Sequence, residues 1–230
     1  MLPPLRNPRR TIGDRSFDFS QRVAVMAIVN RTPDSFYDAG ANYALEDAVA
    51  SALRAVRDGA DWIDIGGVPF APGEPLSVDE ECDRVVPVVH ALRSQSDVVI
   101  SVDTFHADVA RRSIAAGATV INDTTGLSDP NLARVVADSE ASLVLVHSRA
   151  QPRTQFARPQ YDDVAVEVRD FLASRVELAH NAGVPDDRLF VDPGHDLNKN
   201  TLHSLELTRR LDVITELGLP TLVALSNKDF

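Results

Sequence analysis

An α/β barrel, in which parallel strands alternate with helices, is the fold that the sequence predicts. Short runs rich in valine, isoleucine and leucine alternate with longer amphipathic stretches along the 230 residues. The short runs are almost continuously apolar, which is typical of parallel strands covered by helices. In addition, nearly every predicted strand ends in a polar residue, and barrel proteins build their sites from such strand ends.

The alternation divides into seven strands and six helices that follow one another without a second domain. The strands are predicted at 23–29, 62–65, 98–102, 119–121, 143–146, 188–191 and 222–225. The helices are predicted at 44–57, 78–93, 107–115, 131–137, 162–181 and 202–217. Gly59, Gly117 and Gly183 mark helix ends, because glycine readily adopts the left-handed conformation that ends a helix.

The polar strand ends decide between two arrangements that the alternation alone permits, an open doubly wound sheet and a closed barrel. These ends are Asn30, Asp64, Asp103, Asn122 with Asp123, His147, Asp192 and Ser226. A ring of polar groups at successive strand ends favours a TIM-type (β/α)8 barrel. The absence of a Gly-x-Gly-x-x-Gly motif after the first strand weakens the dinucleotide-binding alternative.

One domain is predicted over residues 23–230, preceded by a flexible arm at 1–22 that is basic and proline-rich. The sequence stops at Phe230, directly after the seventh predicted strand. A closed barrel of this type has eight strand–helix units. We therefore expect the last strand–helix unit to lie outside the sequence shown.

Composition narrows the class of protein. The formal net charge of −11 argues against nucleic-acid or membrane-surface binding, and it repels anionic substrates unless cations are concentrated at the site. No apolar run reaches membrane-spanning length, and the N-terminus has no apolar signal-peptide core. A single cysteine, Cys82, excludes an internal disulfide. These features predict a cytoplasmic protein.

The polar strand ends have an ordinary structural explanation, which competes with a site. Asp, Asn and Ser at strand–helix junctions are often helix caps or turn residues, as Ser128 and Asp129 before Pro130 are expected to be. Seven such ends in one chain, several of them outside cap positions, favour a site instead.

The sequence segments around these strand ends resemble those of one known family. Residues 26–36, Met-Ala-Ile-Val-Asn-Arg-Thr-Pro-Asp-Ser-Phe, are similar to the N-V-T-P-D-S-F opening of dihydropteroate synthases. The segments 100–104 (Ile-Ser-Val-Asp-Thr), 120–123 (Val-Ile-Asn-Asp) and 191–194 (Val-Asp-Pro-Gly) follow in that family's order. Residues 225–228, Leu-Ser-Asn-Lys, resemble its final S-R-K element. The resemblance extends from about the first strand to the end of the chain.

This resemblance implies a transferase of folate biosynthesis that joins a pterin diphosphate to para-aminobenzoate. By position it implies that four residues bind the pterin ring: Asp103, Asn122, Asp192 and Lys228. A pterin edge presents donors and acceptors, so carboxylates, an amide and a lysine each find a hydrogen-bonding partner there. Asn30 resembles the residue near the diphosphate and its Mg²⁺. The resemblance therefore implies Mg²⁺ as the cofactor and Asn30 as the only residue in contact with the metal.

Several positions depart from the family pattern. The family's G-G-E-S-T-R-P-G segment is Gly66-Gly67-Val68-Pro69-Phe70-Ala71-Pro72-Gly73 in this chain, so its Glu, Ser, Thr and Arg positions are apolar. In the D-P-G-x-G-F-x-K segment, Asp196 stands at a glycine position and Leu197 at the pterin-stacking phenylalanine. Asn227 replaces the arginine of the last element, and the first loop contains an arginine, Arg31.

The missing arginines are expected to matter for the chemical step. A charge-assisted hydrogen bond contributes about 1.5–3 kcal/mol. Two lost in the transition state would cost roughly 3–6 kcal/mol, or about 10²–10⁴ in rate, because a departing diphosphate needs charge stabilisation. Substitution by Arg31, or by Arg149, Arg153 and Arg158 after the fifth strand, is an alternative, although ordinary solvated charge is the favoured interpretation of those loop arginines.

The preferred interpretation is a dihydropteroate synthase homologue with a partly retained pterin pocket and a degraded diphosphate and para-aminobenzoate site, weakly active or inactive. The alternatives are a working synthase, a non-catalytic pterin- or folate-binding partner protein, and a pterin domain of the methyltransferase kind. The resemblance also implies para-aminobenzoate or sulfonamide- and sulfone-like ligands. It further implies a homodimer formed by late helices, where Leu202, Leu205, Leu211 and Ile214 make an apolar stripe.

Overall fold

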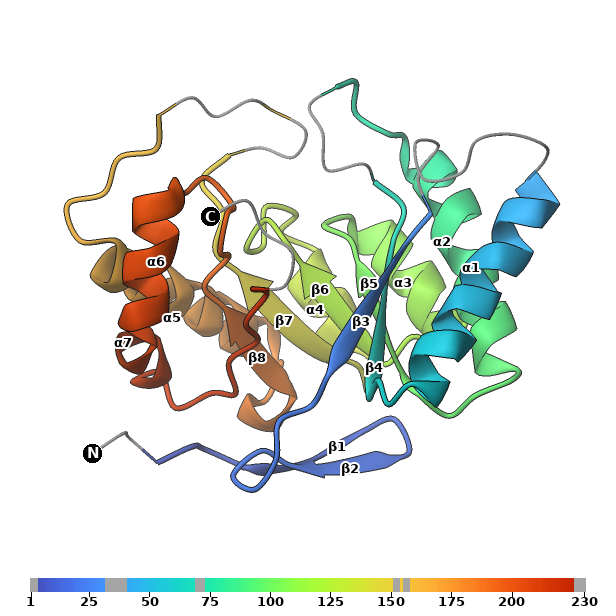
Figure 1. Cartoon of the computed structure of the whole chain (residues 1–230), viewed down its shortest axis with the longest axis horizontal. Helices are drawn as coiled ribbons and strands as arrows, with labels where there is room; N and C mark the ends of the chain where they lie inside the picture. The colour runs from blue at the N-terminus through green and yellow to red at the C-terminus, as the bar shows by residue number, and fades with distance from the viewer. Residues whose placement is uncertain (1–3, 32–40, 69–72, 151–153, 155–157, 226–230) are drawn as a thin grey trace.

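The structure is a computed structural model that describes residues 4–31, 41–68, 73–150, 154 and 158–225. Six parallel strands form one sheet in sequence order. They are β3 (Met26–Asn30), β4 (Trp62–Gly66), β5 (Val99–Asp103), β6 (Val120–Asp123), β7 (Ser142–Val146) and β8 (Leu189–Asp192). The helices are α1 (Ala41–Arg57), α2 (Val78–Arg93), α3 (Ala107–Ala115), α4 (Leu132–Ala137), α5 (Val164–Ala182), α6 (Thr201–Arg209) and α7 (Leu211–Thr215). Figure 1 shows the helices around the outside of the curved sheet.

The larger of two apolar cores lies between the sheet and the helices, and includes Ile63, Ile100, Ile121, Leu143 and Leu189. Local signals in the sequence position its helices. Ser77 and Glu80 form a reciprocal capping box at the start of α2. Gly183, at φ 103°, ends α5 in the left-handed conformation. The predicted helices at 78–93 and 107–115 therefore match α2 and α3.

The inner face of the sheet changes character along its strands. Near the strand starts it is apolar, with Trp62, Val99, Val120, Val144 and Phe190 in the second core. Because side chains alternate between the two faces of a strand, the next inward positions are Asp64 on β4 and Ser101 on β5. Polar residues therefore occupy the half of the barrel interior nearest the strand ends.

A hairpin, β1 (Arg9–Ile12) and β2 (Arg15–Asp18), closes the apolar end of the interior. It lies across the end of the sheet where the strands begin (Figure 1). Ile12 and Phe17 are 2% and 4% exposed, and the Phe17 ring packs edge-on against Trp62. The sequence predicts a flexible arm over 1–22. Residues 9–18 within it form this hairpin instead, because their alternating apolar side chains have a core to enter.

The C-terminal part of the described chain differs from the prediction in two ways. The predicted seventh strand is reduced to a single bridge between Val191 and Thr221, with a hydrogen bond from Leu222 N to Val191 O. Among the described residues no ladder joins this segment to β3, so barrel closure is not seen in them. The predicted helix 202–217 is two helices, because the backbone leaves helical geometry at Arg210 (φ −113°, ψ 34°). No helix within the described ranges is long and apolar enough to span a membrane.

Candidate functional site

Strand register brings the predicted polar ends together. Asn30 on β3 pairs with Gly66 on β4, Gly66 pairs with Asp103 on β5, and Asp103 pairs with Asn122 on β6. Asp192 ends β8, opposite Val146 of β7. The carboxyl ends of parallel strands meet at one end of such a sheet, so these residues lie at the same end of the sheet. Lys228, the fourth expected pterin-binding residue, lies outside the described residues.

The sequence identifies Asp64 only as a polar strand end. In the structure it is the shared acceptor of a buried hydrogen-bond network. It is 4% exposed, on the inner face of β4. Ser101 Oγ donates to Asp64 Oδ1 at 2.5 Å, and Asn122 Nδ2 donates to Asp64 Oδ2 at 3.3 Å. The Asn122 carbonyl oxygen, Oδ1, is buried without a hydrogen-bond partner in the described structure. Alternation on β4, with Trp62, Asp64 and Gly66 facing inward, is the signal that could have located Asp64.

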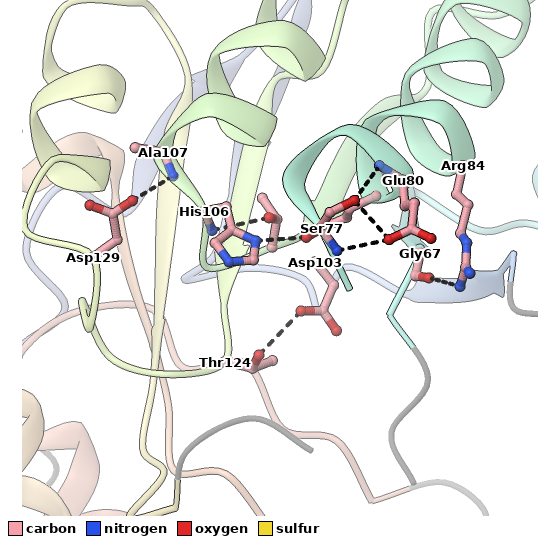
Figure 2. A network of polar contacts seen from close by, with 11 residues as sticks. Gly67, Ser77, Glu80, Arg84, Asp103, His106, Ala107, Thr124 and Asp129 are labelled. Carbon is pink, nitrogen blue, oxygen red and sulfur yellow. Dashed lines mark hydrogen bonds and ion pairs between the residues drawn. The ribbon is translucent and has the colours of Figure 1, made fainter. Parts of the chain in front are cut away.

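Asp103 is half-buried beside this network and turns its carboxylate toward Thr124, whose hydroxyl donates to it at 3.3 Å (Figure 2). Burial raises the pKa of Asp103 well above its ordinary value, and the charge of Asp64 raises it further. Burial also raises the pKa of Asp64, but its two donors oppose that shift. The pair therefore holds one proton at pH values where free aspartates are ionised, and Asp103 is the better place for it.

A second polar network holds the segments near Asp103 (Figure 2). Glu81 of α2 is fully buried and contacts His106 Nδ1 at 2.8 Å, which ties α2 to the segment after β5. Arg84 Nη1 donates to the carbonyl of Gly67 at 3.0 Å, fixing the start of the loop after β4. Asp129 accepts from the backbone N–H of Ala107 at 2.9 Å, at the start of α3. These contacts have a structural role.

Asp123, which the sequence groups with Asn122 as a strand end, has an ordinary structural role in the turn after β6. Its carboxylate accepts from the backbone N–H groups of Thr125 and Leu127 at 2.8 and 2.5 Å, and from the Thr125 hydroxyl at 2.7 Å. It is fully buried and faces the turn. The competing structural explanation is therefore right for Asp123.

The loop that follows Asp192, the last residue of β8, is held by a buried lysine. Asp192 is 5% exposed, and its Oδ1 accepts from the backbone N–H of Gly194 at 2.7 Å. Lys199 Nζ reaches His147 Nδ1 at 2.9 Å and the carbonyls of Gly194 and Leu197 at 2.7 and 3.1 Å. Burial lowers the pKa of Lys199 to about 7. Burial and the charge of Lys199 lower the pKa of His147 to about 2, so His147 is neutral and accepts.

Asn198 ties the same loop to the segment after β7. Its side-chain oxygen accepts from Ser148 Oγ and from the backbone N–H groups of Arg149 and Ala150 at 2.7 to 2.9 Å. Tyr161 Oη donates to the Asn198 carbonyl at 3.0 Å. Neither Lys199 nor Asn198 was assigned a site role in the sequence, because their partners come from distant segments.

The structure explains in part how Asp196 and Leu197, the two departures from the family pattern in this loop, are accommodated. Asp196, at the family's glycine position, adopts φ 68°, the left-handed conformation that glycine prefers and aspartate tolerates. The backbone geometry of that position is therefore kept, while a half-buried carboxylate is added. Leu197 packs against the inner apolar core that contains Phe190. Of the other departures, Val68 is half-buried, and Pro69, Phe70, Ala71 and Asn227 lie outside the described residues.

The arginines that were considered as substitutes make other contacts. Arg31 Nη1 donates to the carbonyls of Asp83 and Arg84 in α2 at 3.0 and 2.8 Å. Pro87 explains the first contact, because it lacks the N–H that would otherwise bond to the Asp83 carbonyl four residues earlier. Arg149 pairs with Glu167 and lies 3.9 Å from the centre of the Tyr161 ring. Arg153 is outside the described residues, and Arg158 is exposed.

Asn30 is the expected contact for Mg²⁺. It is exposed at the end of β3, with its side-chain oxygen close to Gly66. In the described ranges, no group of three His, Cys, Asp or Glu residues is arranged to hold a metal ion. One amide oxygen is a weak start for Mg²⁺, which usually takes carboxylates, phosphates and water. The described residues therefore do not by themselves form a Mg²⁺ site.

Fold and geometry together define an α/β barrel-type protein with buried and half-buried carboxylates and an amide at the ends of its parallel strands. Residues 26–230 match the model of the pterin binding enzyme family, and the chain belongs to that family.

The relatives make it a homologue of dihydropteroate synthase. It is 48% identical over 217 residues to the inactive dihydropteroate synthase 2 of Mycobacterium leprae, covering 92% of this chain and 75% of the relative. The structure of Xanthomonas albilineans dihydropteroate synthase with 4-aminobenzoic acid matches with a TM-score of 0.88 and 41% identity, covering 96% of this chain and 79% of the other. The complex of that enzyme with 7,8-dihydropteroate matches with a TM-score of 0.81 and 39% identity, covering 96% and 78%.

Proposed function

We propose that this chain binds pterins at its strand ends and has little or no dihydropteroate synthase turnover. The observation that carries the proposal is a contrast within one site. Asp103 and Asn122 pair in register, and Asp192 lies at the end of its own strand in the same sheet, whereas the residues expected to hold the diphosphate are replaced. Lys228 is proposed as the fourth pterin contact. The 48% identity to a protein named as inactive supports the same proposal.

Charge supports the loss of diphosphate binding. Ala71 and Asn227 stand at the two arginine positions, Asp196 adds a carboxylate, and the chain as a whole carries a formal charge of −11. The contacts of Arg31 with α2, and of Arg149 with Glu167 and Tyr161, oppose their use as substitutes. Mg²⁺ is proposed only as a companion of the diphosphate near Asn30. Para-aminobenzoate and sulfonamide-like ligands are proposed as weaker ligands of the same site.

The test compares two ligands and turnover. By calorimetry, 6-hydroxymethylpterin should lose less affinity than its diphosphate ester, relative to an active family member. Synthase turnover should be about 10²–10⁴-fold below that of the active enzyme, as expected for two lost charge-assisted contacts. Ala71→Arg with Asn227→Arg and Asp196→Gly should restore diphosphate affinity. Asp196→Gly alone is the matched control, because glycine suits φ 68° at that position.

Turnover of the unmodified chain at the usual level would support the second candidate, a working synthase, and refute the proposal. So would a diphosphate ester bound as tightly as by an active enzyme. The identity of 41% to a synthase is the observation that keeps this candidate in view.

A homodimer is also proposed, through the exposed part of α6. Leu202 and Leu205 are 75% and 51% exposed, whereas Ile214 of the predicted stripe is buried in the core. Leu202→Glu with Leu205→Glu should convert a dimer to a monomer in sedimentation at micromolar concentration, because buried charge without a partner is costly at an interface. A monomeric unmodified chain would contradict the proposal.

A further inference from the structure

Asp64 is a buried acid whose position the pterin contacts do not explain. It lies one inward position before Gly66 on β4, deeper than Asp103 and Asn122, which pair across the next two strands. Its neighbours along β4, Ile63 and Ile65, are fully buried. A carboxylate there is costly unless it is hydrogen-bonded. Both of its oxygens are, to Ser101 and to Asn122.

The Asp64 carboxylate dictates which way the Asn122 amide faces. An ionised carboxylate only accepts hydrogen bonds, so the amide must turn its NH₂ group to Asp64. The opposite end, Asn122 Oδ1, is then buried without a partner in the described part of the chain. An unsatisfied buried carbonyl costs about 1–3 kcal/mol, and a ligand N–H would remove that cost.

Ser101 holds the Asp64 carboxylate in the position from which it orients the Asn122 amide. It is fully buried, it pairs in register with Asp64, and its hydroxyl donates at 2.5 Å. Because Asp64 has two donors and Asp103 has one, at 3.3 Å, Asp64 is the better place for the negative charge of the pair. An ionised Asp64 is the form that fixes the amide.

We infer that Asp64, held by Ser101, is a positioning residue that fixes Asn122 as a hydrogen-bond acceptor and so selects a ligand edge that donates an N–H. The inference rests on the proposed pterin function and deepens it. It predicts that flat heterocycles with an N–H edge are preferred over those that present only acceptors. Asp64 itself lies beneath Asn122 and acts through it.

Asp64→Asn is the test variant, because it keeps the shape and a partner for Ser101 but allows the Asn122 amide to turn over. We expect the Kd for 6-hydroxymethylpterin to rise about tenfold to hundredfold, as for one lost buried hydrogen bond. In an Asn122→Ala background the same change should have no further effect, because Asp64 acts through that amide. Thermal unfolding should show that Asp64→Asn is folded, since it removes a buried charge.

A ligand-free measurement separates this inference from the pterin proposal. The side-chain amide signals of Asn122, assigned with Asn122→Ala, should move in ¹⁵N–¹H spectra when Asp64→Asn or Ser101→Ala is introduced. Unmodified protein that does not bind pterin would refute the proposed function, while these spectra would still decide the positioning role. Unmoved amide signals, an unchanged Kd, or an equal loss in the Asn122→Ala background would each overturn the inference.

Discussion

Gly194→Ala is expected to lower the free energy of unfolding by about 3 kcal/mol or more, and the melting temperature by roughly 6–12 °C. Gly194 has φ 66°, where a side chain costs about 1–2 kcal/mol. An added Cβ would also clash severely with the backbone oxygen of His147, which cannot move without displacing β7. The loop must then shift, and with it the carbonyl that Lys199 binds. Thermal or chemical unfolding measures the loss.

Gly59→Ala is the matched control for this variant. Gly59 also has a positive φ, 106°, but a Cβ there meets nothing within 4 Å. It should therefore lose only the conformational part, about 1–2 kcal/mol. Equal losses in the two variants would show that the contact between the loop and His147 does not matter for stability.

Lys199→Met is expected to remove a large part of the pH dependence of the free energy of unfolding between pH 7 and pH 10.5. The pKa of Lys199 is lowered from 10.5 to about 7 by burial, so its contribution is fully present above pH 10.5 and is lost as the pH falls towards 7. The unmodified chain should therefore gain about 4 kcal/mol between pH 7 and pH 10.5 from this residue. The variant lacks that gain, so the stability of the unmodified chain relative to the variant rises with pH. Denaturant unfolding at a series of pH values measures it.

The titration of Lys199 can also be observed directly. The chain contains two lysines, Lys199 and Lys228. Lysine labelled with ¹³C at Cε therefore gives two resonances, which Lys199→Met assigns. A Lys199 resonance that titrates near pH 10 would contradict both the buried amine and the stability prediction.

Much of the fold follows from patterns that are local in the sequence. Helices α2 and α3 match their predicted bounds because caps and apolar spacing act within a few residues. The strand ends that carry Asp103, Asn122 and Asp192 are visible in the same way. The hairpin at 9–18 was not predicted, because Ile12 and Phe17 become buried only when the barrel interior exists.

The residue types of the site were predictable from the sequence, but the hydrogen bonds between its side chains were not. Asp64 bonds to Ser101 and Asn122, which are 37 and 58 positions away, and Lys199 bonds to His147, 52 positions away. No local pattern reports such partners. Arg31 is a similar case, since its role depends on a carbonyl in α2 that a proline leaves without a donor.

Arg31 and Pro87 are linked through the Asp83 carbonyl, although they lie far apart in the sequence. A homologue that replaces Pro87 regains a helix N–H for the Asp83 carbonyl and competes with Arg31 for it. Conversely, a homologue that replaces Arg31 leaves that carbonyl short of a donor. Arg31 is a cation of the first loop, but it donates to a carbonyl of α2. A protein engineer who wants to release it should therefore replace Pro87 first.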